Sequence, residues 1–106
     1  MSMQAKQVIR EFTQRVQTLY GDRLKRVVIY GSWARNEATA ESDIDLAVVL
    51  ADDVVPGKEI DRMIDILTDI NLEYGELLSV YPVSEEDYLG RNSPLLINIR
   101  REGIPA

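Results

Sequence analysis

Two aspartates separated by one residue, Asp43 and Asp45, have the spacing in this 106-residue chain that most directly suggests chemistry. They open the run DIDLAVVL, residues 43–50, whose β-branched and apolar side chains predict a strand that is polar at its start. Because side chains alternate across a strand, the two carboxylates must project from one face and repel each other. A divalent cation relieves that repulsion, and Mg²⁺ favours one or two carboxylates together with substrate phosphates. The pair therefore predicts a magnesium site with Asp43 and Asp45 as metal ligands and catalytic residues.

A second candidate site, Gly31 and Ser32, directly follows the run LKRVVIY at residues 24–30, which predicts a buried strand. Glycine lets the backbone turn sharply and lets a ligand approach it closely. A short helical turn, predicted over residues 33–38, would point its free N–H groups at a phosphate. The Ser32 hydroxyl adds a donor and Arg35 adds positive charge, although Arg35 could also pair with an acid. The pattern predicts that Gly31, Ser32 and Arg35 bind a nucleotide.

The two candidate sites meet if the strands over residues 24–30 and 43–50 are antiparallel neighbours. The end of the first strand then lies beside the start of the second, and the ten residues between Ser32 and Asp43 allow a short helix and a return. Either motif alone is more often a plain turn or a solvated strand end. Together they place a phosphate-binding turn beside a metal-binding carboxylate pair, which suits phosphoryl or nucleotidyl transfer.

The remaining pattern supplies the elements that must hold this site. Apolar residues three or four apart predict helices over residues 2–20 and 58–74, the second with Ile64 in its buried stripe. Residues 77–83 predict a third strand, and Asp52, Asp53, Pro56 and Gly57 predict a loop. Short helices are predicted after Ser84 and Ser93. The order predicts one α/β (α+β) domain over residues 1–106, with a small mixed sheet of three or four strands flanked by helices.

Composition excludes several classes of function. Without cysteine there is no disulfide, zinc ribbon or thiol catalysis, and without histidine there is no Ser-His-Asp triad. A net charge of −6 disfavours nucleic acid as a direct partner. The first 35 residues nevertheless hold seven basic and two acidic side chains, which could attract an anion. No apolar run approaches the ~18 residues of a membrane span, and no signal core opens the chain, so a cytoplasmic protein is expected.

The spacing Gly31-Ser32, ten residues, Asp43-x-Asp45 resembles the GSx10DxD signature of the DNA polymerase β-like nucleotidyltransferase superfamily. The strings GSWAR and SDIDLAVVL resemble its minimal nucleotidyltransferase branch, and residues 93–103 are similar to the closing helix of that family. The resemblance covers roughly residues 8–104. It implies the nucleotidyltransferase fold, a Mg²⁺-dependent site, a triphosphate held at Gly31 and Ser32, and metal bound by the two aspartates. The family often has glycine where this chain has Asn36, which tolerates a left-handed backbone.

The same resemblance implies partners. Many members are encoded beside a helical HEPN-domain protein, and in such pairs the nucleotidyltransferase is an antitoxin that moves AMP from ATP to a tyrosine of its HEPN toxin. A second chain would complete the acceptor pocket, which makes a homodimer or a hetero-complex plausible. Two alternatives are an antitoxin that acts only by binding its HEPN partner and a nucleotidyltransferase for small molecules.

The presence of a third carboxylate would distinguish an active enzyme from an antitoxin that only binds its partner. The resemblance implies this, because active members of the family carry a third carboxylate on the strand that follows the aspartate pair. The candidate is Glu76, which would reach Asp43 if the third strand runs parallel to the second and which could equally be an exposed residue after Gly75. Trp33 could stack on a nucleobase, but a packing role is favoured.

Overall fold

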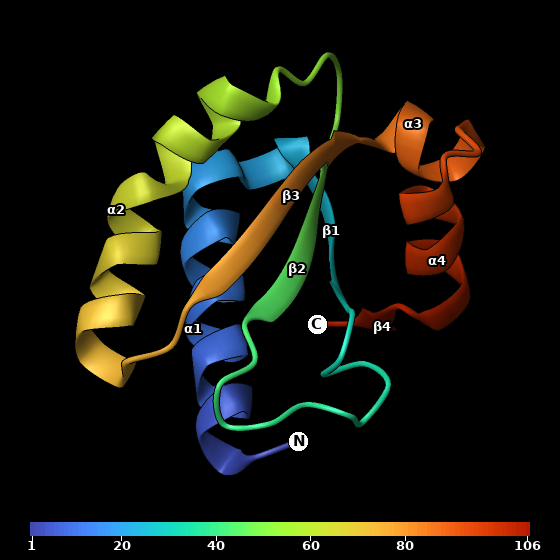
Figure 1. Ribbon diagram of the computed structural model, residues 1–106. Helices are drawn as coiled ribbons and strands as arrows, with labels where there is room; N and C mark the ends of the chain where they lie inside the picture. Colours follow the sequence, from blue (N-terminus) through green and yellow to red (C-terminus); the bar gives the residue numbers. More distant parts are fainter.

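A four-stranded mixed sheet with the strand order β3-β2-β1-β4 forms the centre of the computed structural model, which describes all 106 residues (Figure 1). β1 is antiparallel to β2 and to β4, whereas β2 and β3 are parallel. The prediction of a small mixed sheet flanked by helices is therefore confirmed. The strands are β1 (Leu24–Tyr30), β2 (Ile44–Leu50), β3 (Leu78–Ser84) and β4 (Ile104–Pro105). The helices are α1 (Met3–Tyr20), the 3-10 turn η1 (Gly21–Arg23), α2 (Pro56–Tyr74), α3 (Glu85–Gly90) and α4 (Pro94–Glu102).

Local sequence signals explain where the helices begin and end. At the starts of α1, α3 and α4, the hydroxyls of Ser2, Ser84 and Ser93 accept hydrogen bonds from backbone N–H groups of the first turn. α2 begins earlier than the sequence predicted, because Pro56 occupies its first turn, where a fixed φ and a missing N–H are tolerated. The assignment of residues 56–57 to a loop was therefore wrong.

Helices cover both faces of the sheet. α1 and α2 pack on one face, where alternate residues of β1 and β2 form a core with Phe12 and Met63. α3 and α4 pack on the other face, where Val28, Ala47 and Val49 meet Leu96 and Ile99. The expected stripe of α2 was wrong at one position, since Ile64 is half exposed and Ile66 is buried. No helix is both long and apolar enough to cross a membrane.

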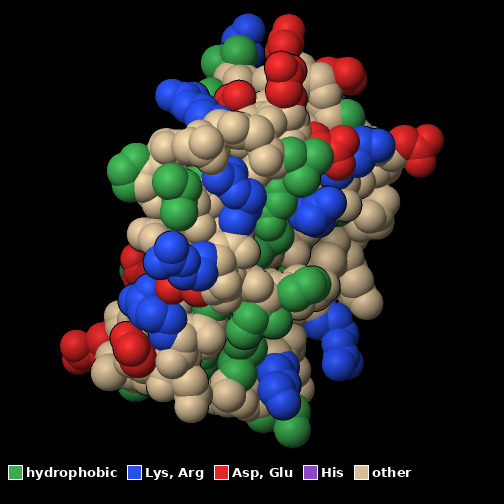
Figure 2. Space-filling model, turned by 90° about the vertical axis from the view of Figure 1, so that its right-hand side faces the viewer, with side chains coloured by type: hydrophobic (Ala, Val, Ile, Leu, Met, Phe, Trp, Pro, Cys, Tyr) green, Lys and Arg blue, Asp and Glu red, His purple; other side chains and the backbone are tan.

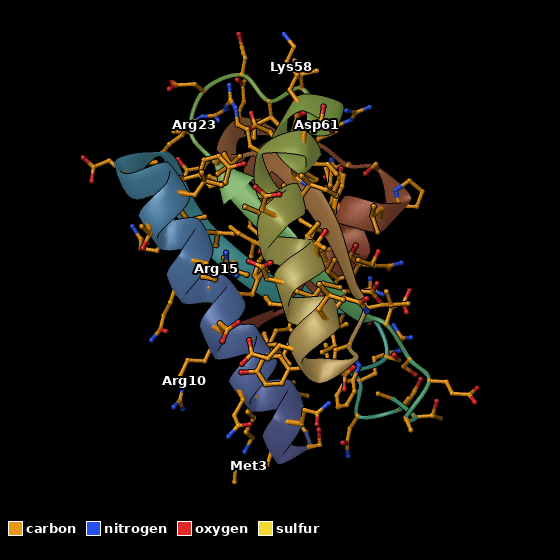
Figure 3. The ribbon with its side chains drawn as sticks, turned by 90° about the vertical axis from the view of Figure 1, so that its left-hand side faces the viewer. Met3, Arg10, Arg15, Arg23, Lys58 and Asp61 are labelled. Atoms are coloured by element: carbon orange, nitrogen blue, oxygen red, sulfur yellow. The ribbon has the colours of Figure 1, made fainter.

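A buried carboxylate joins the end of α1 to the start of α2. Glu59 is only 3% exposed. It accepts hydrogen bonds from Arg23 Nη2 at 2.9 Å, from the Tyr20 hydroxyl at 2.9 Å and from Arg62 Nη1 at 3.1 Å. Figure 3 shows Arg23 at the end of the molecule where α2 begins. These bonds hold the two helices together at the end of the sheet opposite the candidate site.

Candidate functional site

The chain turns sharply after β1, over residues 31–36. The Arg35 N–H donates to the Gly31 carbonyl at 3.1 Å, and the Glu37 N–H donates to the Ser32 carbonyl at 2.9 Å. These bonds form successive turns and not the short helix predicted over residues 33–38. Asn36 explains the difference, because its φ of 59° is left-handed and interrupts a right-handed helix. The same φ confirms the expectation that asparagine fills the position where the family often has glycine.

This turn leaves several hydrogen-bond donors free. The backbone N–H groups of Ser32, Trp33 and Ala34 form no hydrogen bond within the protein, and neither does the Ser32 hydroxyl. Successive free amides at the start of a turn form a concave, partly positive surface. The Gly31-Ser32 segment therefore has the donors that the sequence predicted for a phosphate site.

Gly31 brings this turn against the carboxylate pair. Its φ is +72°, and a Cβ at this position would overlap the Asp45 carboxylate. Glycine is required here for both reasons, since other residues rarely adopt that φ and none would fit the space. The antiparallel register, in which Tyr30 faces Asp45, confirms that the end of β1 meets the start of β2.

Asp45 projects from the sheet on the face that α3 and α4 cover. Its neighbours Ile44 and Leu46 belong to the core on the face covered by α1 and α2, so Asp45 points to the other face. Alternation along the strand places Asp43 on the same face as Asp45. Burial and the neighbouring charge of Asp43 raise the pKa of Asp45, and Ser79 on β3 opposes that rise. Burial, with the charge of Asp45, likewise raises the pKa of Tyr30 to about 12. A pair of neighbouring carboxylates in which the ionised form of one, Asp45, is disfavoured is suited to a cation.

Glu76 does not join this pair. In the parallel register Asp45 lies beside Ser79 of β3. The carbonyl of Leu77, the residue before β3, accepts the Ile44 N–H. The residues next to the two aspartates are therefore a leucine and a serine. Glu76 instead accepts a hydrogen bond from Gln4 Nε2 of α1 at 3.0 Å. No three acidic side chains gather as a metal-binding group anywhere in the chain. β3 is parallel to β2, which was the condition for Glu76 to reach Asp43, but the Glu76 side chain instead bonds to α1.

Arg35 is paired with two acids. Its Nη1 donates to both Glu102 carboxylate oxygens at 3.1 Å, and its Nε donates to Glu37 at 3.2 Å. Glu102, at the end of α4, also accepts the Gly31 N–H at 3.2 Å. Sequence reasoning missed Glu102, because it lies 71 residues from Gly31 and no local pattern connects them.

The largest cavity, of about 680 Å³, is lined by neither of the two aspartates. Trp33, Asn36 and Thr39 line it together with Tyr74 and Glu76. Trp33 packs against the core formed with α1 and α2, so the packing role predicted for it is confirmed.

Comparisons with known proteins place this fold in a known family. The family model described as "Nucleotidyltransferase domain" matches residues 9–99. Two relatives come from Methanocaldococcus jannaschii. "Putative protein adenylyltransferase MJ0604" is 36% identical over 79% of this chain and 78% of its own length. "Putative protein adenylyltransferase MJ0141" is 34% identical over 73% of this chain and 77% of its own length.

Two solved structures share the fold. A crystal structure of a toxin–antitoxin with AMP-PNP superposes with a TM-score of 0.62 at 14% identity, over 89% of this chain and 68% of the other. A mutant of the toxin–antitoxin MntA–HpeT superposes with a TM-score of 0.54 at 18% identity, over 96% and 70%. The matched family model covers the Gly31-Ser32 turn, the aspartate pair and all three long strands. This chain belongs to the nucleotidyltransferase domain family.

Proposed function

We propose that this protein transfers AMP from ATP, with Mg²⁺, to a hydroxyl acceptor, and that the acceptor is a tyrosine of a HEPN-domain toxin for which it acts as the antitoxin. The observation that carries the proposal is the contact between Gly31 and Asp45, because it joins a turn with free amides to a pair of carboxylates. The names of the relatives support adenylyl transfer to a protein. We also expect a cytoplasmic location, where ATP is available.

The residues present fit Mg²⁺. Asp43 and Asp45 offer hard oxygen donors on one face, and partial burial together with the charge of Asp43 disfavours the ionised form of Asp45 unless a cation balances it. Two protein carboxylates match the preference of Mg²⁺ for few protein ligands together with substrate phosphates. When bound, the ion would neutralise charge on the triphosphate and on the departing pyrophosphate.

The chain itself would bind and orient the nucleotide. The free amides of Ser32, Trp33 and Ala34 and the Ser32 hydroxyl would hold phosphate oxygens. The acceptor hydroxyl oxygen then forms a bond to the α-phosphorus while the bond from that phosphorus to pyrophosphate breaks. The hydroxyl loses its proton to water, and pyrophosphate leaves. In such transfers the protein contributes mainly position and charge stabilisation.

The two structural neighbours support a toxin partner. Both are toxin–antitoxin structures, and one holds AMP-PNP, a nucleoside triphosphate analogue. A tyrosine hydroxyl is an acceptor that requires no chemistry beyond the phosphoryl transfer described above. The partner would also supply acceptor-side surface next to the aspartates.

Mass spectrometry of a reaction tests the proposal. The chain is mixed with ATP, Mg²⁺ and the HEPN-type protein encoded beside it, and the experiment is repeated with Asp43→Ala and Asp45→Ala. We expect an added AMP on a tyrosine of the partner with the unmodified chain and none with either variant. Asp53→Ala is the matched control, since Asp53 is an exposed aspartate far from the turn and its variant should transfer AMP normally.

A second candidate function is an antitoxin that acts by binding alone. The specific observation in its favour is the register of β3, which places Ser79 beside Asp45 where a third carboxylate would complete the site. For that function, no AMP is added, and the partner forms an equally stable complex with the chain and with its Asp43→Ala variant.

A further inference from the structure

We propose that Glu102 is an internal competitor for the phosphates of the nucleotide: its carboxylate accepts hydrogen bonds from the Gly31 amide and from Arg35 and must leave these donors when a triphosphate binds. This inference rests on the proposed function, since it assumes that the turn after β1 binds triphosphate. It assigns a role in nucleotide affinity to the end of α4, a segment that contributes no donor to the turn.

The contacts of Glu102 are those of a bound anion. Its Oε1 accepts the Gly31 N–H at 3.2 Å and Arg35 Nη1 at 3.1 Å, and its Oε2 accepts the same Nη1 at 3.1 Å. A backbone amide and a guanidinium are the groups that proteins use to bind phosphate. A carboxylate and a phosphate oxygen therefore compete for the same donors.

The main chain of Glu102 is held in place, so only its side chain can move away. The next residue, Gly103, packs so closely that a Cβ there would overlap the Ile99 carbonyl and the Val28 side chain. The Gly103 N–H donates to the Ile99 carbonyl at 2.8 Å, and Ile104 pairs with Ile29 in the sheet. The Glu102 side chain is 23% exposed, which leaves it a path to solvent.

The rest of the turn explains how displacement would begin. The amides of Ser32, Trp33 and Ala34 are free while Gly31 is occupied. A triphosphate can therefore bind first to the free amides, which brings its negative charge close to the Glu102 carboxylate. Repulsion between the two anions then favours release of Glu102, and Arg35 becomes available to the phosphates.

Calorimetry with AMP-PNP and Mg²⁺ tests the competition. Glu102→Gln keeps the size of the side chain but removes its charge and weakens its hydrogen bonds. In the unmodified chain, a bound phosphate must first break the hydrogen bonds of Glu102, and the net free energy of one hydrogen bond is modest. We therefore expect AMP-PNP to bind about threefold to tenfold more tightly to Glu102→Gln. Inorganic tripolyphosphate, which has no base or sugar, should show a similar gain. Equal or weaker binding of either probe would overturn the inference.

Glu37→Gln is the matched control. Glu37 also pairs with Arg35, at 3.2 Å, but it does not contact the Gly31 amide. If occupation of the amide is what limits binding, Glu37→Gln changes the affinity for AMP-PNP less than twofold. A gain equal to that of Glu102→Gln would show that only the charge near Arg35 matters and would contradict the inference.

The outcomes separate this inference from the proposed function. If the unmodified chain binds AMP-PNP and Glu102→Gln gains nothing, the role of Glu102 is wrong and the proposed function stands. If neither protein binds AMP-PNP, both are wrong. Thermal unfolding confirms that the variants are folded. Should Glu102→Gln fail to fold, Glu102→Asp replaces it, because the shorter side chain withdraws the carboxylate from Gly31 and should also tighten binding.

Discussion

Gly31 lies where the three chemical groups of the site meet. Its backbone contacts the Asp45 carboxylate, its N–H donates to Glu102, and the free amides begin at the next residue, Ser32. A single residue without a side chain thus sets the distance between the carboxylate pair and the turn that would hold phosphate. Its φ of +72° lies in a region that other residues adopt only with strain.

Gly31→Ala should damage both stability and nucleotide binding. The added methyl group would displace Asp45 and strain the turn, so we expect the free energy of unfolding to fall by about 1–3 kcal/mol. Nucleotide binding should fall at least tenfold because the carboxylates move away from the turn. Chemical denaturation and calorimetry measure the two effects. Gly57→Ala is the control, since no atom lies within 4 Å of its added Cβ and its stability should be unchanged or slightly higher.

Asp45→Asn should stabilise the metal-free protein while removing function. Burial and Asp43 raise the pKa of Asp45, so its ionised form disfavours folding. That penalty is fully present at neutral pH and disappears as pH falls through the folded-state pKa, where the carboxyl is protonated. In EDTA, thermal unfolding should therefore occur at a higher temperature for Asp45→Asn at pH 7, and the difference should shrink toward pH 4. A variant less stable than the unmodified chain at pH 7 would contradict this.

At the scale of elements, α1 and α2 are joined by a charged cluster and α4 is joined to the turn by another. The first consists of Glu59 with Arg23, Tyr20 and Arg62. Glu59, which supplies its carboxylate, is almost fully buried. The second consists of Glu102 with Arg35 and the Gly31 amide. Because the first cluster lies far from the turn, its role in stability can be separated from nucleotide binding.

Glu59→Ala should destabilise the fold without weakening nucleotide binding. The substitution leaves Arg23 partly buried without its partner, which should lower the free energy of unfolding by about 2–4 kcal/mol. Chemical denaturation measures the loss, and calorimetry with AMP-PNP should show unchanged affinity at a temperature where the variant is folded. Asp61→Ala, on an exposed position of the same helix, should change stability by less than about 0.5 kcal/mol.

The contribution of Glu59 should also depend on pH. Although burial alone would raise the pKa of Glu59, hydrogen bonds from Arg23 and Tyr20 hold it below its ordinary value. A lowered folded-state pKa stabilises the protein above the ordinary pKa of 4.5 and loses that effect as pH falls through the folded-state value. The stability difference between the chain and Glu59→Ala should therefore be largest near neutral pH and narrow in acid. A difference independent of pH would rule out this account.

At the scale of the whole molecule, the site lies at one end of a sheet covered on both faces. The turn after β1, the start of β2 and the chain leading into β3 gather at that end, near the N-terminus (Figure 1). Figure 2 shows basic, acidic and hydrophobic side chains interspersed on the side that carries α3 and α4. The first turn of α3 adds three acids, Glu85, Glu86 and Asp87, to this side of the molecule.

Binding of Mg²⁺ and AMP-PNP should stabilise the whole fold. A ligand that binds only the folded state adds about 2.7 kcal/mol at a hundredfold excess over its Kd, so thermal unfolding should shift upward. EDTA should reduce the shift, and Asp43→Ala should abolish it. Absence of any shift with the unmodified chain at millimolar AMP-PNP would contradict nucleotide binding.

Much of the fold and of the candidate site could be predicted from sequence because the signals are local. Strand alternation placed Asp43 and Asp45 on one face, and the position of Gly31 after an apolar strand indicated a sharp turn. Helical periodicity located both long helices to within two residues, and the largest difference is the start of α2 at Pro56. Each inference depended on residues only a few positions apart, whose relative placement is set by backbone geometry.

The tertiary structure decided which distant groups meet. By itself, the sequence determined the order of the long helices and the three long strands, the carboxylate pair and the glycine turn, because periodicity and backbone geometry act within an element. Only the packing of helices on the sheet brought Glu102 to Gly31, joined Glu59 to Arg23 and directed Glu76 to Gln4. Those contacts depend on the register of strands and the placement of helix ends, which many residues determine together and no short stretch of sequence encodes.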